Sequence, residues 1–206
     1  MDKNYWEEYY KKNAAPTDPS TFAKFCLPKF KKGEVLLEIG CGNGRDSIFF
    51  GKNNINVIAI DQSEEEMKKL QSLNYQNVMF KTADMVYDNE AYIPNFNNYV
   101  YSRFTLHAIN EKEQLIVIKN VYESLKKGGL FLIEVRSTKD EIFGKGEKVD
   151  KNAYVYEGHY RRFIDFNELK EIAKNFNFNI EYAIEGKDLA QYKDSNPTVI
   201  RMILKK

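Results

Sequence analysis

The chain has 206 residues, of which 43% are hydrophobic and 30% charged, the size and composition of one ordinary soluble globular domain. Because 31 Lys and Arg residues stand against 30 Asp and Glu residues, the net charge is only +1, which excludes a general attraction to nucleic acid or anionic membranes. The first residues are charged, unlike a signal peptide, and no run approaches the ~20 apolar residues that cross a bilayer. We therefore expect a cytoplasmic protein without membrane insertion or nucleic-acid partners; its oligomeric state is not predicted.

The amino-terminal part of the chain predicts two helices. Residues 4–13 read as a short aromatic helix, and prolines separate it from a second helix over about 20–30. We expect this first part, about 1–32, to form a helical cover over the domain that follows.

Strands and helices then alternate. The apolar run 34–40 is typical of a strand covered on both faces of a sheet. Ser63 is expected to cap a helix, with Glu66 completing a capping box, and Gly128 and Gly129 are expected to end a later helix. This alternation predicts right-handed βαβ units and a parallel sheet. The expected strands are 34–40, 56–61, 77–84, 99–104 and 129–136, and the expected helices include 45–52 and 111–126.

The last third of the chain begins with a segment of weak periodicity, 137–163. A segment of this length is uncommon in a compact domain unless it forms a lid or a binding loop, and Gly144 and Gly146 are candidate hinges. No linker divides the chain, so we predict one domain, 1–206, with a substrate lid at about 137–163. A helix at about 165–176 and strands at 179–185 and 198–204 complete it, the two strands forming an edge hairpin.

The sharpest motif is Glu38-Ile39-Gly40-Cys41-Gly42-Asn43-Gly44, at the expected turn from the first strand into a helix. Its glycines permit positive φ and a close approach of backbone to a ligand, and the start of the helix favours negative charge. A dinucleotide-binding G-x-G-x-x-G motif requires glycine at the position of Arg45, which disfavours an NAD-dependent oxidoreductase. Cys41 and Cys26 lack the spacing of a disulfide framework or a metal site, so no metal is predicted.

Acidic residues also end the next two strands. Asp61 follows the first glycine by about twenty positions, where a carboxylate accepts hydrogen bonds from ribose hydroxyls. Asp84 ends the third strand, where it would accept from an exocyclic amino group. With Glu38, these residues place three carboxylates at the carboxyl ends of successive strands, the ligand-binding edge of a doubly wound sheet. A nucleoside ligand is predicted.

The segments LLEIGCGNGRDSIFF, VIAID and KTADM resemble the class I S-adenosylmethionine-dependent methyltransferase family, and the resemblance extends over about 35–136. It implies a doubly wound, Rossmann-like α/β fold with seven strands in the order 3-2-1-4-5-7-6, strand 7 being antiparallel. It also implies S-adenosyl-L-methionine as cofactor and S-adenosyl-L-homocysteine as product.

The same resemblance implies roles for individual residues. The glycines would pass beneath the methionine part of the cofactor, Asp61 would hold the ribose, and Gln62 would flank the adenine. Ser102 and Arg103 would face the methionine end. We add two aromatic residues of the amino-terminal helix as a candidate cover. The expected cofactor-binding residues are Glu38, Gly40, Cys41, Gly42, Gly44, Asp61, Gln62, Asp84, Met85, Ser102, Arg103, Trp6 and Tyr10.

The expected acceptor side of this edge is cationic and holds both histidines of the chain. Histidine takes up a proton near neutral pH, and the planar fork of arginine pairs with two oxygens of a phosphate or carboxylate. We therefore expect catalytic roles for His159, His107 and Arg103. The expected substrate-binding residues are Arg136, Tyr160, Arg161 and Arg162.

These residues favour O-methylation of a small anionic metabolite or surface-glycan precursor that carries phosphate or phosphoramidate. SRFTLHAI, EVRS and GHYRRF are similar to methyltransferases of bacterial surface-polysaccharide clusters, including those that methylate a capsule phosphoramidate. The alternatives are an N- or S-methyltransferase acting on a neutral metabolite or a toxic oxyanion, and a non-catalytic cofactor-binding partner protein. The chain lacks the Asn/Asp-Pro-Pro-aromatic turn that often follows strand four in enzymes methylating base amino groups, which disfavours a DNA substrate.

Overall fold

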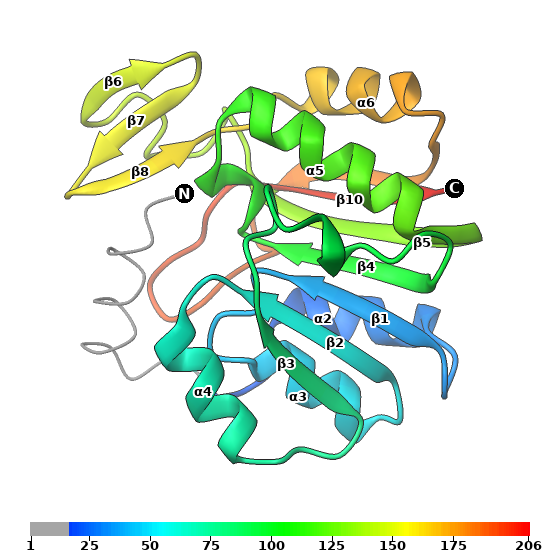
Figure 1. Cartoon of the computed structure of the whole chain (residues 1–206). Helices are drawn as coiled ribbons and strands as arrows, with labels where there is room; N and C mark the ends of the chain where they lie inside the picture. Colours follow the sequence, from blue (N-terminus) through cyan, green and yellow to red (C-terminus); the bar gives the residue numbers. More distant parts are fainter. Residues whose placement is uncertain (1–16) are drawn as a thin grey trace.

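The computed structural model describes residues 17–206, in which a seven-stranded sheet lies between two layers of helices (Figure 1). Its strands, in chain order, are β1 (Val35–Ile39), β2 (Asn56–Asp61), β3 (Val78–Thr82), β4 (Asn97–Arg103), β5 (Leu125–Arg136), β9 (Asn179–Gly186) and β10 (Val199–Lys205). Their order across the sheet is β3-β2-β1-β4-β5-β10-β9; β10 pairs antiparallel with both of its neighbours, β5 and β9, and the other neighbouring strands pair parallel. This confirms the predicted strand order and the reversed seventh strand.

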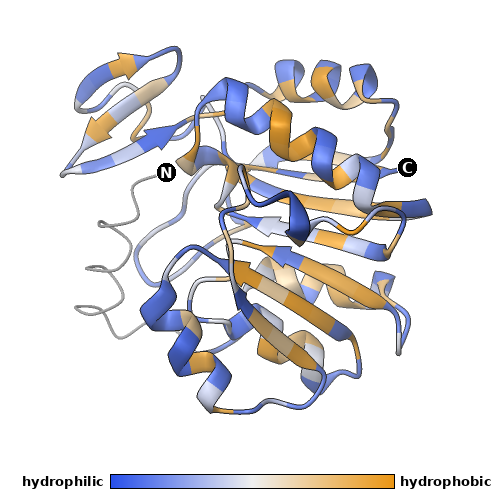
Figure 2. Cartoon of the chain, viewed as in Figure 1, coloured by the Kyte–Doolittle hydropathy of each residue, from blue (hydrophilic) through white to orange (hydrophobic). Residues whose placement is uncertain are grey.

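The helices divide between the two faces of the sheet. One face is covered by α2 (Thr21–Cys26), α3 (Arg45–Lys52) and α4 (Glu64–Ser72), and the other by α5 (Glu111–Ser124) and α6 (Phe166–Asn175) (Figure 1). The short helices are η1 (Leu27–Lys29), η2 (Asn89–Ala91) and η3 (Leu106–Ala108). Figure 2 shows the hydrophobic strands between them. In the described part of the chain, no helix has both the length and the apolar character to cross a membrane.

Two hydrophobic cores result, because successive residues of a strand point to opposite faces. Leu36 packs with Phe22 and Phe50 in the core beneath α2 and α3. Its neighbour Leu37 belongs to the core beneath α5, which also contains Val117. Strands buried on both faces explain the continuous apolar runs of the sequence. Because both faces of the sheet are packed against helices, the strands hold the turns at their carboxyl ends in fixed positions.

The expected end of the helix at 111–126, with Gly128 and Gly129 after it, was wrong. Helix α5 ends at Ser124, where the N–H of Leu125 closes the last turn on the carbonyl of Val121, and the chain enters β5 at once. Gly128 therefore lies within β5, and its N–H donates to the carbonyl of Lys206 at 2.8 Å. A glycine that pairs with the carboxyl terminus does not act as a helix cap.

The expected capping box at α4 is half present. The Ser63 hydroxyl accepts from the N–H of Glu66 at 3.4 Å, as predicted. The reciprocal bond is replaced, because the N–H of Ser63 donates to Asp61 Oδ1 at 3.0 Å and the Glu66 carboxylate lies 3.4 Å from Lys69 Nζ. The residue at the end of β2 thus takes over the role expected of Glu66.

Residues 137–163 contain a small second sheet, seen apart from the main sheet in Figure 1. It consists of β6 (Glu147–Asp150), β7 (Ala153–Tyr156) and β8 (His159–Arg162), all antiparallel. Strands of four residues are too short to give a clear periodicity, which explains the weak pattern of this segment. Phe163 anchors it, packing edge-on at 5.5 Å against the ring of Phe143. A lid function for this segment remains a prediction. The expected helix 4–13 lies outside the described residues.

Candidate active site

The glycine motif forms the turn between β1 and α3, with positive φ at Gly40 (70°), Gly42 (54°) and Gly44 (72°). A Cβ added to Gly40 would lie 2.4 Å from Thr105 Cγ2, and one added to Gly44 would lie 2.8 Å from the ring of Phe80. Both contacts are closer than real side chains allow. Thr105 and Phe80 therefore pack so closely against Gly40 and Gly44 that these positions have no room for a side chain, and the resulting turn of bare backbone fits the expected cofactor-binding cradle.

Asp61 joins the end of β2 to this turn. Its Oδ2 accepts from the N–H of Gly42 at 2.9 Å, and its Oδ1 accepts from the N–H of Ser63 at 3.0 Å. Burial raises the pKa of Asp61, and the amide donors oppose that shift. Each carboxylate oxygen keeps a further lone pair. The carboxylate is thus oriented by the backbone and fits the expected grip on a ribose.

Behind the turn lie two buried acids. Ser47 Oγ donates to Glu38 Oε2 at 2.5 Å, and burial followed by repulsion from Asp46 raises the pKa of Glu38 well above its usual range. Asp46 accepts from the N–H and Oγ of Ser20, both at 2.7 Å, and from Tyr101 Oη at 2.8 Å. The start of α2 is in this way fixed to α3 and β4.

Cys41 is buried within the same turn, and burial raises the pKa of its thiol well above the usual range. Cys26 is also a free, buried thiol. A protonated thiol is a small apolar filler, so Cys41 shapes the turn by its size. In residues 17–206 no cluster of three or more His, Cys, Asp or Glu side chains is arranged to hold a metal ion.

The expected adenine side lies beyond β2 and β3. Gln62 is buried, and its Nε2 has no hydrogen-bond partner among the described residues. Asp84 Oδ1 accepts from the N–H of Val86 at 2.7 Å, and Tyr92 Oη donates to the carbonyl of Met85 at 2.7 Å. These bonds occupy Asp84 Oδ1 and the Met85 carbonyl with partners from the protein, and the expected role of Asp84 and Met85 in adenine binding stays a prediction.

The expected methionine end lies at the end of β4. Ser102 is fully buried beside Ile39, and its Oγ has no partner within the described part of the chain. Arg103 Nε donates to Glu134 Oε1 at 2.9 Å. Buried polar atoms without partners occur at ligand sites more often than elsewhere. The orphaned atoms at both ends of the turn, with the glycine cradle between them, fit a long polar cofactor.

Phe104 was not expected from the sequence, yet it is central to the neighbouring surface. It follows β4 with a φ of 55°, a conformation that bulky residues rarely adopt. The guanidinium carbons of Arg103 and Arg136 lie 4.4 and 5.8 Å from its ring centroid, and the ring of His107 lies at 5.4 Å. Strained residues cluster at functional sites, but no pattern in the sequence signals this one.

The segments that carry the two histidines, β8 and η3, pack against each other, and His107 lies beside the Phe104 ring. Both histidines are buried, and burial, then the charges of Arg136 and His159, lowers the pKa of His107 well below its usual range. The Nδ1 of His107 has no hydrogen-bond partner within residues 17–206. His107 is therefore neutral near pH 7, and a neutral imidazole is able to accept a proton. The predicted approach of these two segments is present.

The expected substrate-binding arginines are held differently from one another. Arg136 donates from Nη1 to both oxygens of Asp140 at 3.0 Å. The guanidinium of Arg136 also lies over the ring of Phe104. Arg162 is buried and donates to the carbonyl of Ile109 at 2.9 Å and to the Gln114 side chain, so it ties β8 to the start of α5.

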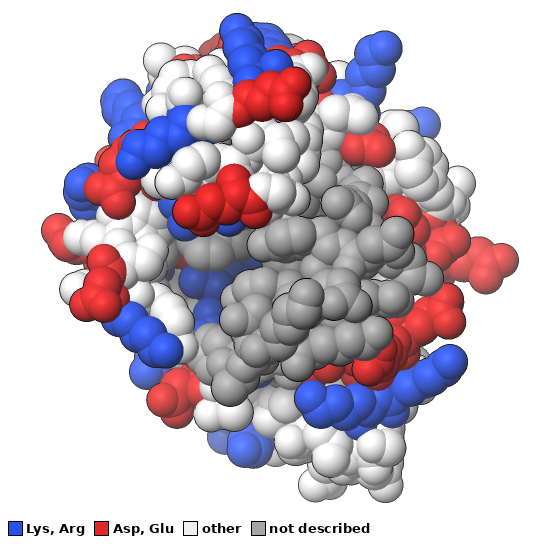
Figure 3. Space-filling model, turned by 90° about the vertical axis from the view of Figure 1, so that its left-hand side faces the viewer, with Lys and Arg blue, Asp and Glu red and all other residues white. Residues whose placement is uncertain are grey.

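The two residues between His159 and Arg162 are only partly buried. Arg161 contacts the Tyr156 carbonyl at 3.4 Å. Tyr160 has a buried hydroxyl without a partner among the described residues. Trp6 and Tyr10, the expected cofactor cover, lie outside those residues. Figure 3 looks onto this side of the molecule and shows Lys and Arg side chains inside a hollow, with Asp and Glu around it.

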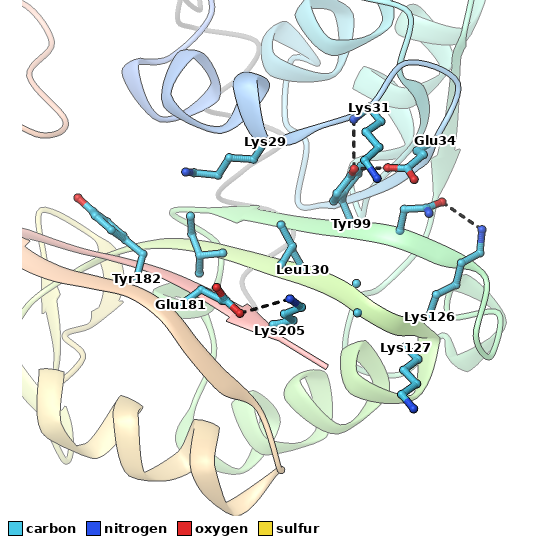
Figure 4. A pocket seen from close by; sticks show the side chains of 14 residues that line it. Lys29, Lys31, Glu34, Tyr99, Lys126, Lys127, Leu130, Glu181, Tyr182 and Lys205 are labelled. Atoms are coloured by element: carbon cyan, nitrogen blue, oxygen red, sulfur yellow. Dashed lines mark hydrogen bonds and ion pairs between the residues drawn. The ribbon is translucent and has the colours of Figure 1, made fainter.

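A separate groove of about 600 Å³ lies at the opposite edge of the sheet, at the amino ends of the parallel strands (Figure 4). Tyr99 and Leu130 form part of its floor. Its charged lining residues are Lys29, Lys31, Glu34, Lys126, Lys127, Glu181 and Lys205. It lies away from the glycine turn and contains none of the expected site residues.

The doubly wound sheet, with the glycine turn and Asp61 at the carboxyl ends of its parallel strands, is typical of an enzyme that binds a nucleoside cofactor. The sequence model described as a methyltransferase domain matches residues 5–183, and the chain belongs to this family. S-adenosylmethionine is accordingly its cofactor. The resemblance inferred from the motifs is thereby confirmed.

Two curated relatives and one solved structure illustrate the similarity. Phosphoethanolamine N-methyltransferase 1 of Triticum aestivum is 29% identical over 150 residues, which cover 65% of this chain and 30% of the relative. The probable S-adenosyl-L-methionine-dependent methyltransferase TehB of Haemophilus influenzae (strain 10810) is 26% identical over 142 residues, 68% of this chain and 47% of the relative. The chain therefore matches less than half the length of either.

The solved structure is 1,6-didemethyltoxoflavin-N1-methyltransferase of Burkholderia thailandensis with bound 1,6-didemethyltoxoflavin and S-adenosylhomocysteine. Its TM-score is 0.76 at 17% identity, and the match covers 98% of this chain and 85% of the other. At this identity the likeness shows the fold.

Proposed function

We propose that the chain transfers the methyl group of S-adenosylmethionine to an oxygen atom of a small anionic acceptor that carries phosphate or phosphoramidate, such as a metabolite or a surface-glycan precursor. The observation that carries this proposal is the arrangement around Phe104. Two guanidinium groups lie over one ring, within reach of a neutral imidazole. Arginine forks bind the oxygens of a phosphate group, and the imidazole receives the proton that a hydroxyl loses.

The chemistry requires little beyond positioning. The cofactor supplies an activated methyl group, so the acceptor oxygen forms the new C–O bond while the C–S bond breaks and its electron pair stays on sulfur. The hydroxyl proton passes to His107 or His159. Because the pKa of His107 is low, this residue is neutral and ready to accept, and it releases the proton readily afterwards.

The relatives named for phosphoethanolamine support a phosphate-bearing acceptor. They also favour a second candidate, N-methylation of a phosphorylated amine. An amine that is already neutral attacks without a general base, whereas a hydroxyl needs one. At a pH at which the amine is neutral, the two candidates therefore differ in their dependence on the histidines. The expected link to capsule phosphoramidate remains a prediction, and the curated relatives reported above do not bear on it.

The test is release of S-adenosylhomocysteine with matched acceptor pairs, phosphorylated and dephosphorylated, in hydroxyl and amine series that include phosphoethanolamine. We expect turnover with phosphorylated members only. Arg136→Ala should raise KM about tenfold or more with little change in kcat, because the acceptor phosphate loses one charge-assisted pair with arginine. Lys148→Ala, which removes an exposed cation of β6, is the control and should leave KM unchanged.

A preference for dephosphorylated acceptors, or an unchanged KM in Arg136→Ala, would contradict the anionic acceptor. His107→Ala and His159→Ala decide between oxygen and nitrogen. A fall in kcat with the hydroxyl acceptor supports O-methylation, and an unchanged kcat with the amine supports the second candidate.

A further inference from the structure

The groove at the amino ends of the parallel strands is lined by more cations than anions (Figure 4). Its volume of about 600 Å³ lies within the range of pockets that bind small ligands. Its charged lining residues are five lysines and two glutamates: Lys29, Lys31, Lys126, Lys127 and Lys205, with Glu34 and Glu181. The lining therefore has three more positive than negative charges, in a chain whose net charge is only +1.

A bulge in β5 brings two of these lysines to the groove. Residues 125 and 130 of β5 pair with residues 97 and 99 of β4, so residues 126–129 stand opposite a single residue of β4. Their sequence is Lys-Lys-Gly-Gly, and Gly128 has a φ of 80°, which other residues rarely adopt. Bulges redirect side chains and are common beside active sites. This one presents two consecutive lysines on the same side of the sheet edge.

Two lysines of the groove are oriented by neutral groups. Lys126 Nζ donates to Asn98 Oδ1 at 3.1 Å, and the same oxygen accepts from the N–H of Val35 at 3.1 Å. Lys29 Nζ lies 4.9 Å from the ring centroid of Phe25. An amide oxygen or an aromatic ring holds an ammonium group in place without neutralising its charge. Both lysines therefore keep a full positive charge at the groove.

The carboxylates of the lining do not remove the surplus. Glu181 lies 3.5 Å from Lys205, in a pair that is exposed on both sides. Glu34 accepts from the hydroxyl of Tyr99, which stays neutral because burial and this hydrogen bond raise the pKa of Tyr99 to about 12. Glu123, the next carboxylate along the chain before the bulge, lies 3.9 Å from a lysine of its own helix.

Lys31 and Lys127 carry charges that no protein group uses. Among residues 17–206, neither ammonium group has a hydrogen-bond or ion-pair partner. In Figure 4 the two lysines extend from different sides of the groove, Lys31 from the chain after η1 and Lys127 from β5. One phosphate group would engage one of these sides, whereas linked phosphate groups would engage both. Lysine is a compact point charge that suits phosphate oxygens.

We propose that this groove binds a small ligand with linked phosphate groups, an inorganic or organic triphosphate, at a site separate from the cofactor and the methyl acceptor. A nucleic acid fits less well, because two carboxylates interrupt the lysines and the net charge of +1 provides no general attraction to a long polyanion. This inference does not depend on the identity of the acceptor.

The test is calorimetry on the full chain with inorganic triphosphate, orthophosphate and ATP as probes, with saturating S-adenosylhomocysteine present to occupy the cofactor site. We expect triphosphate to bind at least about tenfold more tightly than orthophosphate, because it engages several lysines at once. In the double variant Lys31→Met/Lys127→Met its Kd should rise about tenfold, the effect of two exposed charge pairs. Equal Kd values for ATP and triphosphate support recognition of the phosphates alone, and a lower Kd for ATP supports an organic triphosphate.

Lys145→Met/Lys148→Met is the matched control, because it removes two exposed lysines of the segment 137–163 and should leave the Kd for triphosphate unchanged. Both double variants should bind S-adenosylhomocysteine as wild type does, which shows that they are folded. Triphosphate binding that is lost in Arg136→Ala and retained in Lys31→Met/Lys127→Met would place the ligand at the acceptor site and overturn the proposal. So would a wild-type chain that binds no triphosphate, or that binds a short single-stranded oligonucleotide more tightly.

Discussion

Gly40→Ala tests whether the glycine turn is required by close packing or only by backbone conformation. At a φ of 70° an alanine is strained by about 1–2 kcal/mol. Its Cβ would also lie 2.4 Å from Thr105 Cγ2 and 2.7 Å from Oγ1, and such overpacking costs about 1–3 kcal/mol. We therefore expect the free energy of unfolding to fall by about 2–5 kcal/mol, a large part of the stability of an ordinary domain.

Gly33→Ala is the matched control, because Gly33 has a φ of 80° and no atom within 4 Å of an added Cβ. It keeps the backbone strain without the collision, so its loss should be about 1–2 kcal/mol. Urea unfolding of the two variants measures the difference directly. Thr105→Ser removes the methyl group nearest Gly40 and should recover part of the loss in the Gly40→Ala background. Equal losses in Gly40→Ala and Gly33→Ala would refute the packing argument.

Two further predictions concern ionisable residues of the site. Asp61→Ala removes the acceptor of the Gly42 and Ser63 amides, so the Kd for S-adenosylhomocysteine, measured by calorimetry, should rise at least about tenfold; an unchanged Kd would contradict a role in ribose binding. His107→Gln tests a pH dependence. The folded chain keeps His107 neutral, while the unfolded chain binds a proton below about pH 6.5, so the free energy of unfolding falls as the pH falls through that value. When the pH is lowered from about 7.5 to about 5, Tm should therefore fall less in His107→Gln than in wild type. Identical Tm profiles for the two proteins would disprove this pH dependence.

The order of the sheet could be predicted because each strand carries its own local pattern. Residues 56–61 and 45–52 were expected as a strand and a helix with the boundaries that the structure has. The end of α5 was predicted wrongly, because a glycine such as Gly128 is a common helix cap and was interpreted as one. Its pairing with Lys206, 78 positions away along the chain, prevents that role. Contacts between distant residues override local preference.

The site divides in the same way. Residues of the glycine turn and Asp61 belong to a contiguous motif with characteristic spacing, and the structure brings them together. The partners of the arginines could not be predicted. Glu134 is one residue within an apolar strand, and nothing near it in the sequence indicates that it meets Arg103 and Arg201. Arg162 was expected to bind the substrate, yet it is buried and donates to the carbonyl of Ile109.

By itself, the sequence determined the doubly wound sheet, the turn that carries the cofactor site and the family, because short-range features govern them: strand hydrophobicity, positive φ at glycine, and acids at strand ends. Only the tertiary structure decided which cations serve a ligand and which serve the protein. Phe104 between Arg103 and Arg136, and the shared carboxylate of Glu134, arise where separate strands end side by side. The net charge at such a junction depends on neighbours in space, and the order of residues along the chain does not encode it locally.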